Sequence, residues 1–185
     1  MTRDRYFLAL LPPSEIQAQI LPIQQDLTET YSLKRRPNSP PHITLYPPFE
    51  WDAENVPLLI KTLQTFTQNW MPIPIQLTGF GAFKPRVIFI QPRQTSPLME
   101  LQRSLKTELE TQLHLEDINR DRAFSPHITV AFCDRRKSDF SQVWLAVKNQ
   151  EFNANFTVAR LTLLIYQNRY WHLYQEFEFS GSSST

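Results

Sequence analysis

A four-residue segment occurs twice in this sequence, and the repeat limits what the chain can fold into. Pro41-His42-Ile43-Thr44 returns 85 residues later as Pro126-His127-Ile128-Thr129, in a chain of 185 residues with only 4 histidines. The segments before the two copies also match in character: an apolar stretch of strand length comes first, and a helical pattern follows. A repeat on this scale indicates a duplicated structural unit, so we expect two similar halves.

The segments before the first copy predict a strand and a helix. Residues 6–11 are continuously apolar, which is typical of a buried strand. Residues 14 to about 31 carry isoleucine and leucine at steps of three and four, which predicts a helix. Ser14 is expected to cap this helix, and Pro22 to interrupt or kink it.

The segments before the second copy repeat that order. Residues 87–90 again predict a short buried strand. Ser96 then opens a helix with Pro97 at its first position, and five leucines recur on one face. Each half therefore runs strand, helix, and then a strand that carries the Pro-His-Ile-Thr motif.

The remaining segments complete an α+β fold. Helices are expected at 54–68 and 139–148, and strands at 73–78, 156–166 and 170–179. The prolines of residues 73–78 favour a sheet edge, and residues 167–169 a hairpin. We expect one domain over residues 1–180, followed by a flexible tail at 181–185. It would consist of two pseudo-symmetric lobes, each an antiparallel sheet flanked by helices, around a central cleft.

Composition excludes several classes of function. Lys and Arg number 19 and Asp and Glu 18, so the net charge of +1 disfavours binding of duplex DNA through global charge. One cysteine excludes an internal disulfide and a Cys-rich metal site. With 3 glycines there is no GxGxxG or Walker loop, and no GxSxG occurs. No stretch approaches the roughly 20 apolar residues of a membrane span. We expect a soluble, cytoplasmic monomer without a metal or cofactor.

The motif itself predicts chemistry when it lies on a strand. Residues two apart on a strand point to the same side. His42 and Thr44 would then share one face while Ile43 and its successor Leu45 enter the core, and the second copy would do the same. Each copy thus sets an imidazole beside a hydroxyl. One such strand alone more often carries a merely structural histidine, but a matched pair favours a functional role.

Two such units facing one point suit a phosphodiester. One imidazole can take a proton from the nucleophile and the other can give one to the leaving oxygen, because histidine titrates near neutral pH. Thr44 and Thr129 can donate hydrogen bonds to the non-bridging oxygens. Two histidines without a third ligand do not favour a zinc site.

These residues resemble the two-histidine (2H) phosphoesterase superfamily, whose signature is a duplicated His-x-Thr-x with x hydrophobic. Both copies are complete here, as His42-Ile43-Thr44-Leu45 and His127-Ile128-Thr129-Val130. The wider context, including Pro47-Pro48-Phe49 and the segment from Gly79 to Ile90, is similar to the 2′-5′ RNA ligase/cyclic phosphodiesterase branch. The resemblance covers roughly residues 5–179.

The resemblance implies a bilobal α+β fold and metal-independent hydrolysis of 2′,3′-cyclic phosphates on small nucleotides or RNA ends. It assigns His42 and His127 as general base and acid, without fixing which is which. It also implies a related exchange, in which a ribose hydroxyl replaces water and 2′-5′ ligation results.

Other residues are candidates for substrate binding. Tyr46 and Phe132 could stack on a base or instead pack between the lobes, and Arg86 could reach a phosphate. Basic residues near both motifs, Arg122 among them, could attract a nucleotide or RNA end, or could simply be solvated. The others in this set are Lys34, Arg35, Arg36, Arg120, Arg135, Arg136 and Lys137.

The sequence is also compatible with two roles other than that of an enzyme. The same cleft could bind a nucleotide or RNA end without turnover, as a binding module. The proline- and tryptophan-rich loops could instead dock a protein partner. His114, His172 and Cys133 are interpreted as structural residues.

Overall fold

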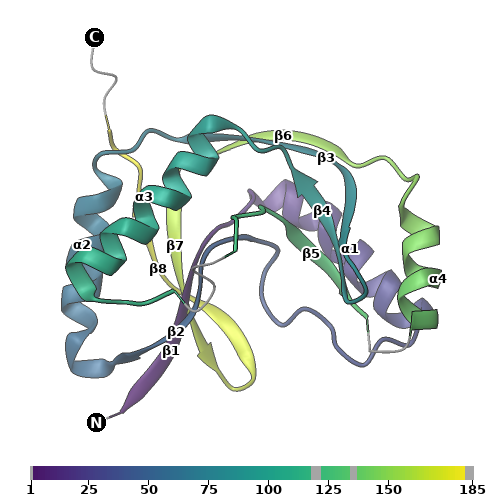
Figure 1. The fold of residues 1–185 in the computed structure, drawn as a ribbon, viewed down its shortest axis with the longest axis horizontal. Coiled ribbons are helices and arrows are strands. Elements are labelled where there is room, and N and C mark those ends of the chain that lie inside the picture. Colours follow the sequence, from purple (N-terminus) through teal and green to yellow (C-terminus); the bar gives the residue numbers. More distant parts are fainter. Residues whose placement is uncertain (1, 118–121, 134–136, 182–185) are drawn as a thin grey trace.

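The computed structural model describes residues 2–117, 122–133 and 137–181, and in these ranges eight strands form two antiparallel four-stranded sheets (Figure 1). The first sheet has the order β2-β1-β7-β8, and the second β5-β4-β3-β6. The strands of the first are β1 (Arg3–Leu10), β2 (Ile43–Asp52), β7 (Arg160–Gln167) and β8 (Tyr170–Glu178). Those of the second are β3 (Ile73–Phe83), β4 (Val87–Pro92), β5 (Ile128–Phe132) and β6 (Asn153–Val158).

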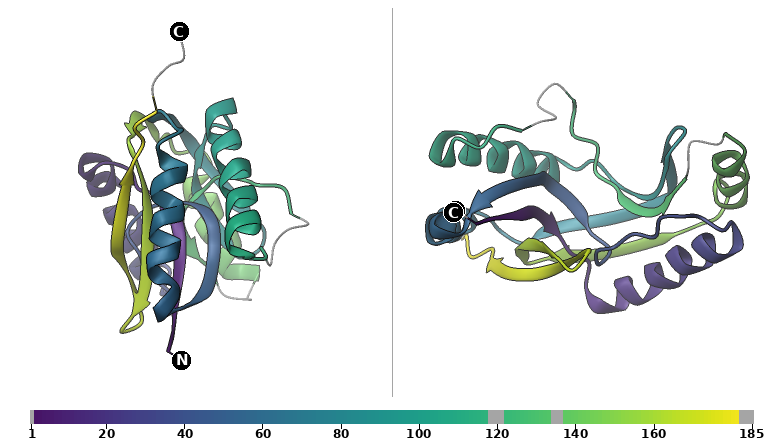
Figure 2. Two further views of the ribbon diagram at one scale, coloured as in Figure 1. Left: turned by 90° about the vertical axis from the view of Figure 1, so that its left-hand side faces the viewer. Right: turned by 90° about the horizontal axis from the view of Figure 1, so that it is seen from below.

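Helices flank both sheets. Within the described ranges they are α1 (Ser14–Thr30), α2 (Val56–Thr67), α3 (Ser96–Leu113) and α4 (Lys137–Val147), with a short 3-10 turn, η1 (Ala53–Asn55), before α2. Figures 1 and 2 show α2 and α3 at the end of the molecule formed by the first sheet, and α1 and α4 at the other end. Helix α1 contacts β5, so the helix of the first half packs on the motif strand of the second.

The two halves occupy equivalent places in the two sheets, as the duplication predicts. In each, the first strand pairs on one side with the motif strand at the sheet edge, β1 with β2 and β4 with β5. The registers also correspond: Ala9 pairs with Thr44, and Phe89 with Thr129. The α+β class and the two antiparallel sheets flanked by helices are confirmed.

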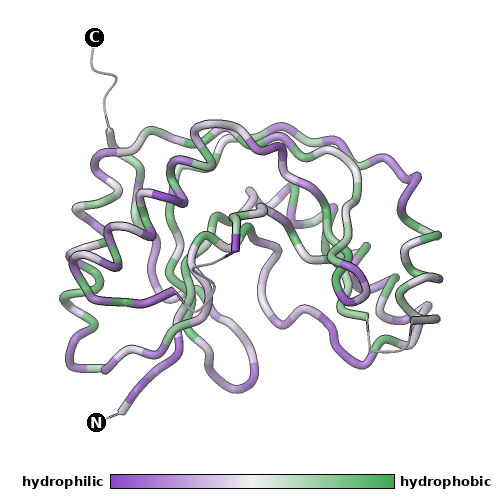
Figure 3. Tube along the Cα trace, in the orientation of Figure 1, coloured by the Kyte–Doolittle hydropathy of each residue, from purple (hydrophilic) through white to green (hydrophobic). Residues whose placement is uncertain are grey.

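The buried apolar residues form one main core between sheets and helices. The five leucines expected on one face of α3 are all buried there, and Figure 3 shows apolar and polar residues alternating along α2 and α3. Strand β1 is buried on both faces: Tyr6 and Leu8 enter the main core, while Phe7 and Ala9 form a smaller cluster on the opposite face. This double burial explains the continuous apolar run of residues 6–11.

Several local expectations need correction. Pro13, not Ser14, occupies the N-cap of α1, and Pro22 lies inside the helix without ending it. Strand β3 is interior, not an edge. At Pro74, however, it pairs only with β6, since β4 joins from Leu77 onward, so a residue without an amide hydrogen is tolerated.

The expected strand 156–166 is two strands, β6 and β7, that belong to different sheets. The hairpin at residues 167–169 is confirmed between β7 and β8, with Asn168 and Arg169 both at positive φ. None of the described helices combines the length and the apolar character that crossing a membrane requires.

Candidate functional site

The two motifs lie at the starts of the edge strands. His42 directly precedes β2 and His127 directly precedes β5. Burial alternates as a strand requires: in the second copy Ile128 and Val130 are buried while His127 and Thr129 are only partly so. The first copy has the same pattern, so each motif directs its imidazole and hydroxyl away from the core.

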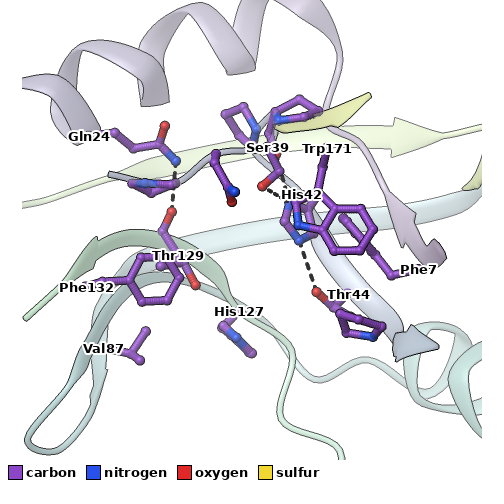
Figure 4. A pocket seen from close by; sticks show the side chains of 15 residues that line it. Phe7, Gln24, Ser39, His42, Thr44, Val87, His127, Thr129, Phe132 and Trp171 are labelled. Carbon is purple, nitrogen blue, oxygen red and sulfur yellow. Dashed lines mark hydrogen bonds between the residues drawn. The ribbon is translucent and has the colours of Figure 1, made fainter. Parts of the chain in front are cut away.

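Both motifs line one cavity of about 230 Å³. Figure 4 shows the side chains of His42, Thr44, His127 and Thr129 around it, contributed by two sheets and brought together by the fold. The other residues that line it are Phe7, Gln24, Pro37, Asn38, Ser39, Pro40, Pro41, Pro48, Val87, Phe132 and Trp171.

The same backbone contact orients both imidazoles. In each motif Nδ1 lies 2.8 Å from the carbonyl oxygen two residues earlier, that of Pro40 for His42 and that of Ser125 for His127. A carbonyl only accepts hydrogen bonds, so Nδ1 carries the proton and the Nε2 of the neutral ring is an acceptor. The Oγ1 of Thr44 lies 3.1 Å from the Nε2 of His42, and its hydroxyl donates to that nitrogen.

Aromatic rings pack against both imidazoles and shield them from part of the surrounding water. The ring of Phe7 lies 4.8 Å from that of His42, and the ring of Phe83 lies 4.9 Å from that of His127, centroid to centroid. Phe89 packs on His127 at 5.5 Å. Burial disfavours the charged imidazolium.

The pKa values of both histidines are lowered from the ordinary value. Burial lowers the pKa of His42 from 6.5 to about 4, with a smaller contribution in the same direction from the charge of His127, while the Pro40 carbonyl opposes the shift. Burial likewise lowers the pKa of His127, opposed by the Ser125 carbonyl. In the free protein at pH 7 both rings are therefore neutral, and both can act as bases.

Gln24 is a cavity residue that the sequence reasoning missed. Its side chain is 2% exposed, and its Nε2 donates a hydrogen bond of 2.9 Å to the carbonyl oxygen of Thr129. It thus holds β5, an edge strand of the second sheet, to α1. A signal was present: Gln24 follows Ile20 by four residues and precedes Leu27 by three, so a polar side chain interrupts the buried face of α1.

Gly81 is a second missed residue, and it acts through Phe89. A Cβ at Gly81 would lie 2.6 Å from the Cζ of Phe89, which is closer than real Cβ atoms come to other heavy atoms. A side chain at this position would therefore force the ring that packs on His127 to shift. The local sequence does not reveal this contact, because it crosses from β3 to β4.

Of the four residues predicted to bind substrate, one lies at the cavity and three do not. Phe132 lines the cavity. Tyr46 is 1% exposed in the main core, where its hydroxyl donates to the Leu115 carbonyl at 3.1 Å, so the structure does not bring it to the cavity. Arg86 and Arg122 are exposed and do not line it.

The basic residues near the two motifs also differ in where the structure places them. Lys34, Arg35 and Arg36 line a second, adjoining cavity. Arg120, Arg135 and Arg136 lie outside the described residues, and Lys137 is the first residue of α4. Within the described ranges, no group of three or more His, Cys, Asp or Glu is placed to hold a metal ion.

Comparison with known proteins identifies the family. The model of the 2′-5′ RNA ligase superfamily matches residues 12–169. The chain belongs to this superfamily. The predicted resemblance to two-histidine phosphoesterases is thereby confirmed.

Relatives and solved structures agree with the superfamily. A protein of Oceanobacillus iheyensis, provisionally named a phosphoesterase, is 31% identical over 94% of this chain and 96% of its own length. Two solved structures share the fold at a TM-score of 0.73: TT0787 of Thermus thermophilus and Escherichia coli LigT complexed with 3′-AMP. They are 22% and 20% identical and cover 96% and 97% of this chain, and 98% and 99% of their own. The superfamily and its relatives support phosphoesterase activity.

Proposed function

We propose that this protein hydrolyses 2′,3′-cyclic phosphodiesters of small nucleotides or RNA ends, using His42 and His127 as general base and general acid. The observation that carries the proposal is the pair of matched imidazoles on one cavity, each with Nδ1 held by a carbonyl oxygen and Nε2 left as the reactive nitrogen. Structures of Escherichia coli LigT in complex with 3′-AMP, phosphate, ATP and NADP+ support a nucleotide or phosphate ligand for this cavity.

The reaction needs two proton transfers on opposite sides of the phosphorus. One Nε2 takes a proton from water as the water oxygen bonds to phosphorus, and the other imidazolium gives its proton to the ribose oxygen as the P–O bond of the ring breaks. The product is a nucleotide monophosphate, and the two rings have exchanged protonation states. A ribose hydroxyl in place of water would give ligation by the same transfers.

The lowered pKa values bear on how the acid is supplied. Free His42, with a pKa of about 4, is almost wholly neutral at pH 7. A phosphate anion between the rings favours the charged form of a neighbouring imidazole, because opposite charges at short range raise its pKa. Substrate binding would therefore charge one ring by proton uptake and create the acid only in the complex.

The threonines would hold the charge that develops on phosphate. The Thr44 hydroxyl, which donates to the Nε2 of His42 in the free protein, can turn to a non-bridging oxygen and release that nitrogen for proton transfer. Thr129 occupies the equivalent place in the second motif, and its backbone is fixed by Gln24.

Turnover of 2′,3′-cyclic AMP in the presence of EDTA tests the proposal. The unaltered protein should produce a monophosphate, and His42→Gln or His127→Gln should each slow the reaction by roughly 10²-fold or more. His114→Gln is the matched control, since that side chain is exposed and lines neither cavity.

An unchanged rate in either cavity variant would refute the assigned roles. Saturable binding of 3′-AMP with no turnover of the cyclic nucleotide would instead support the alternative of a binding module.

A further inference from the structure

The first motif strand has an irregularity directly after its threonine. Ala9 pairs with Thr44, but the residue before Ala9 on β1 pairs with Tyr46. Leu45 is therefore an extra residue in β2, which forms a β-bulge. A bulge bends its strand and changes the direction of the side chains beside it, so the direction of His42 and Thr44 depends on how this bulge is held.

The second motif strand has the same irregularity at the equivalent place. Phe89 pairs with Thr129, but the residue before Phe89 on β4 pairs with Ala131. Val130 is therefore the extra residue in β5, and it is buried, as is its counterpart Leu45. Because both copies carry the bulge, it belongs to the duplicated unit rather than to one strand.

A glutamine from the opposite half of the chain contacts each bulge. The Nε2 of Gln24 donates to the carbonyl of Thr129, which immediately precedes the extra residue of β5, at 2.9 Å (Figure 4). The Nε2 of Gln102 donates to the carbonyl of Leu45, the extra residue of β2, at 3.3 Å. Gln24 lies on α1 of the first half and Gln102 on α3 of the second, so each helix reaches the motif strand of the other half.

These two hydrogen bonds support strands that have little other lateral support. Both β2 and β5 are end strands in the order of their sheets, so each pairs with only one neighbouring strand of its own sheet. A hydrogen bond from a packed helix gives each strand a second attachment, and it does so at the bulge, where the strand ladder is locally disrupted.

We propose that Gln24 and Gln102 form a reciprocal brace between the two halves, in which each glutamine sets the direction of the histidine on the opposite motif strand. Gln24 would position His127, and Gln102 would position His42. Both are positioning residues, and Gln102 lines neither cavity, so it acts only through β2. Proton transfer needs both rings in place, and a misplacement of about 1 Å can slow a reaction roughly 10²-fold. This inference rests on the proposed function for the reaction that is assayed.

Turnover of 2′,3′-cyclic AMP gives the first test. Gln24→Met and Gln102→Met keep an unbranched side chain of similar length and remove the donor. Each should lower kcat by roughly ten- to a hundredfold and leave KM nearly unchanged, because substrate still enters the cavity but meets a misdirected ring. Urea unfolding establishes that each variant is folded at the assay temperature. Gln25→Met on α1 and Gln112→Met on α3 are matched controls at exposed positions, and they should keep the unaltered kcat.

NMR gives a second test that does not depend on turnover. The ring-proton resonances of each imidazole in the ligand-free protein report the surroundings of that ring. Gln24→Met should shift the resonances of His127 more than those of His42, and Gln102→Met should do the reverse. A general loosening of the structure would affect both histidines alike in either variant, so the crossed pattern is specific to the brace.

The outcomes separate this inference from the proposed function. If cyclic AMP is hydrolysed and both methionine variants retain the unaltered kcat, or if KM rises while kcat is unchanged, the brace is refuted and the proposed function stands. If cyclic AMP is not hydrolysed but the crossed shifts are seen, the proposed function fails and the brace stands. Shifts that affect both histidines alike, or mainly the histidine of the same half, overturn the brace whatever the turnover.

Discussion

The burial of His42 predicts how the stability of the folded protein changes with pH. Its pKa is about 4 in the folded state against an ordinary value of 6.5. As the pH falls below 6.5, the unfolded chain takes up this proton while the folded chain does not. Protonation therefore favours unfolding, and the stability that His42 contributes at neutral pH is lost between pH 6.5 and pH 4.

The two pKa values set the size of the effect. Between pH 7 and pH 5 the free energy of unfolding should fall by about 2 kcal/mol through His42 alone. His127 adds to the loss in the same direction, since its pKa is also lowered by burial. His42→Gln removes one titrating group and leaves the carboxylates and the other histidines in place, so their contributions cancel in the comparison.

Urea unfolding at pH 7 and pH 5 measures the difference. The free energy of unfolding of the unaltered protein should decrease by about 2 kcal/mol more than that of His42→Gln over this interval. Parallel changes in the two proteins would show that the imidazole is as well solvated when folded as when unfolded. The account of the cavity as a desolvated site would then be wrong.

Three further predictions concern the surroundings of the imidazoles. Gln24→Leu leaves the Thr129 carbonyl without its donor, and it should lower the free energy of unfolding by about 1–3 kcal/mol in urea titrations. Gly81→Ala forces the Phe89 ring to move, so it should cost about 1–3 kcal/mol in the same assay and reduce the turnover of cyclic AMP. Phosphate should raise the pKa of His42, which NMR titration of the imidazole would follow; a pKa that stays at about 4 with phosphate bound would contradict the proposed source of the acid.

The duplicated motif predicted the parts of the fold that are set locally. The hydrophobic periodicity and the repeated motif predicted the strands before each helix, the buried leucine face of α3, and the position of His42 and His127 on the same side of their strands as their threonines. These features depend on neighbours within a few residues, and such neighbours can be read directly from the sequence.

Features that depend on pairing between distant segments could not be predicted in this way. Whether β3 lies inside a sheet, or where the run from 156 to 166 passes from one sheet to the other, is decided by partners far along the chain. Tyr46 illustrates the same limit at the site. It follows the first motif closely, yet a change of register in the pairing of β1 with β2 accompanies its burial in the core, where its hydroxyl donates to the Leu115 carbonyl.

A crystal structure of the protein with 3′-AMP bound would test the central claim most directly. The account predicts a phosphate between the two motifs, with the Nε2 atoms of His42 and His127 each within about 3.2 Å of a phosphate oxygen. A phosphate that contacts one imidazole only, or that lies outside the cavity, would contradict it.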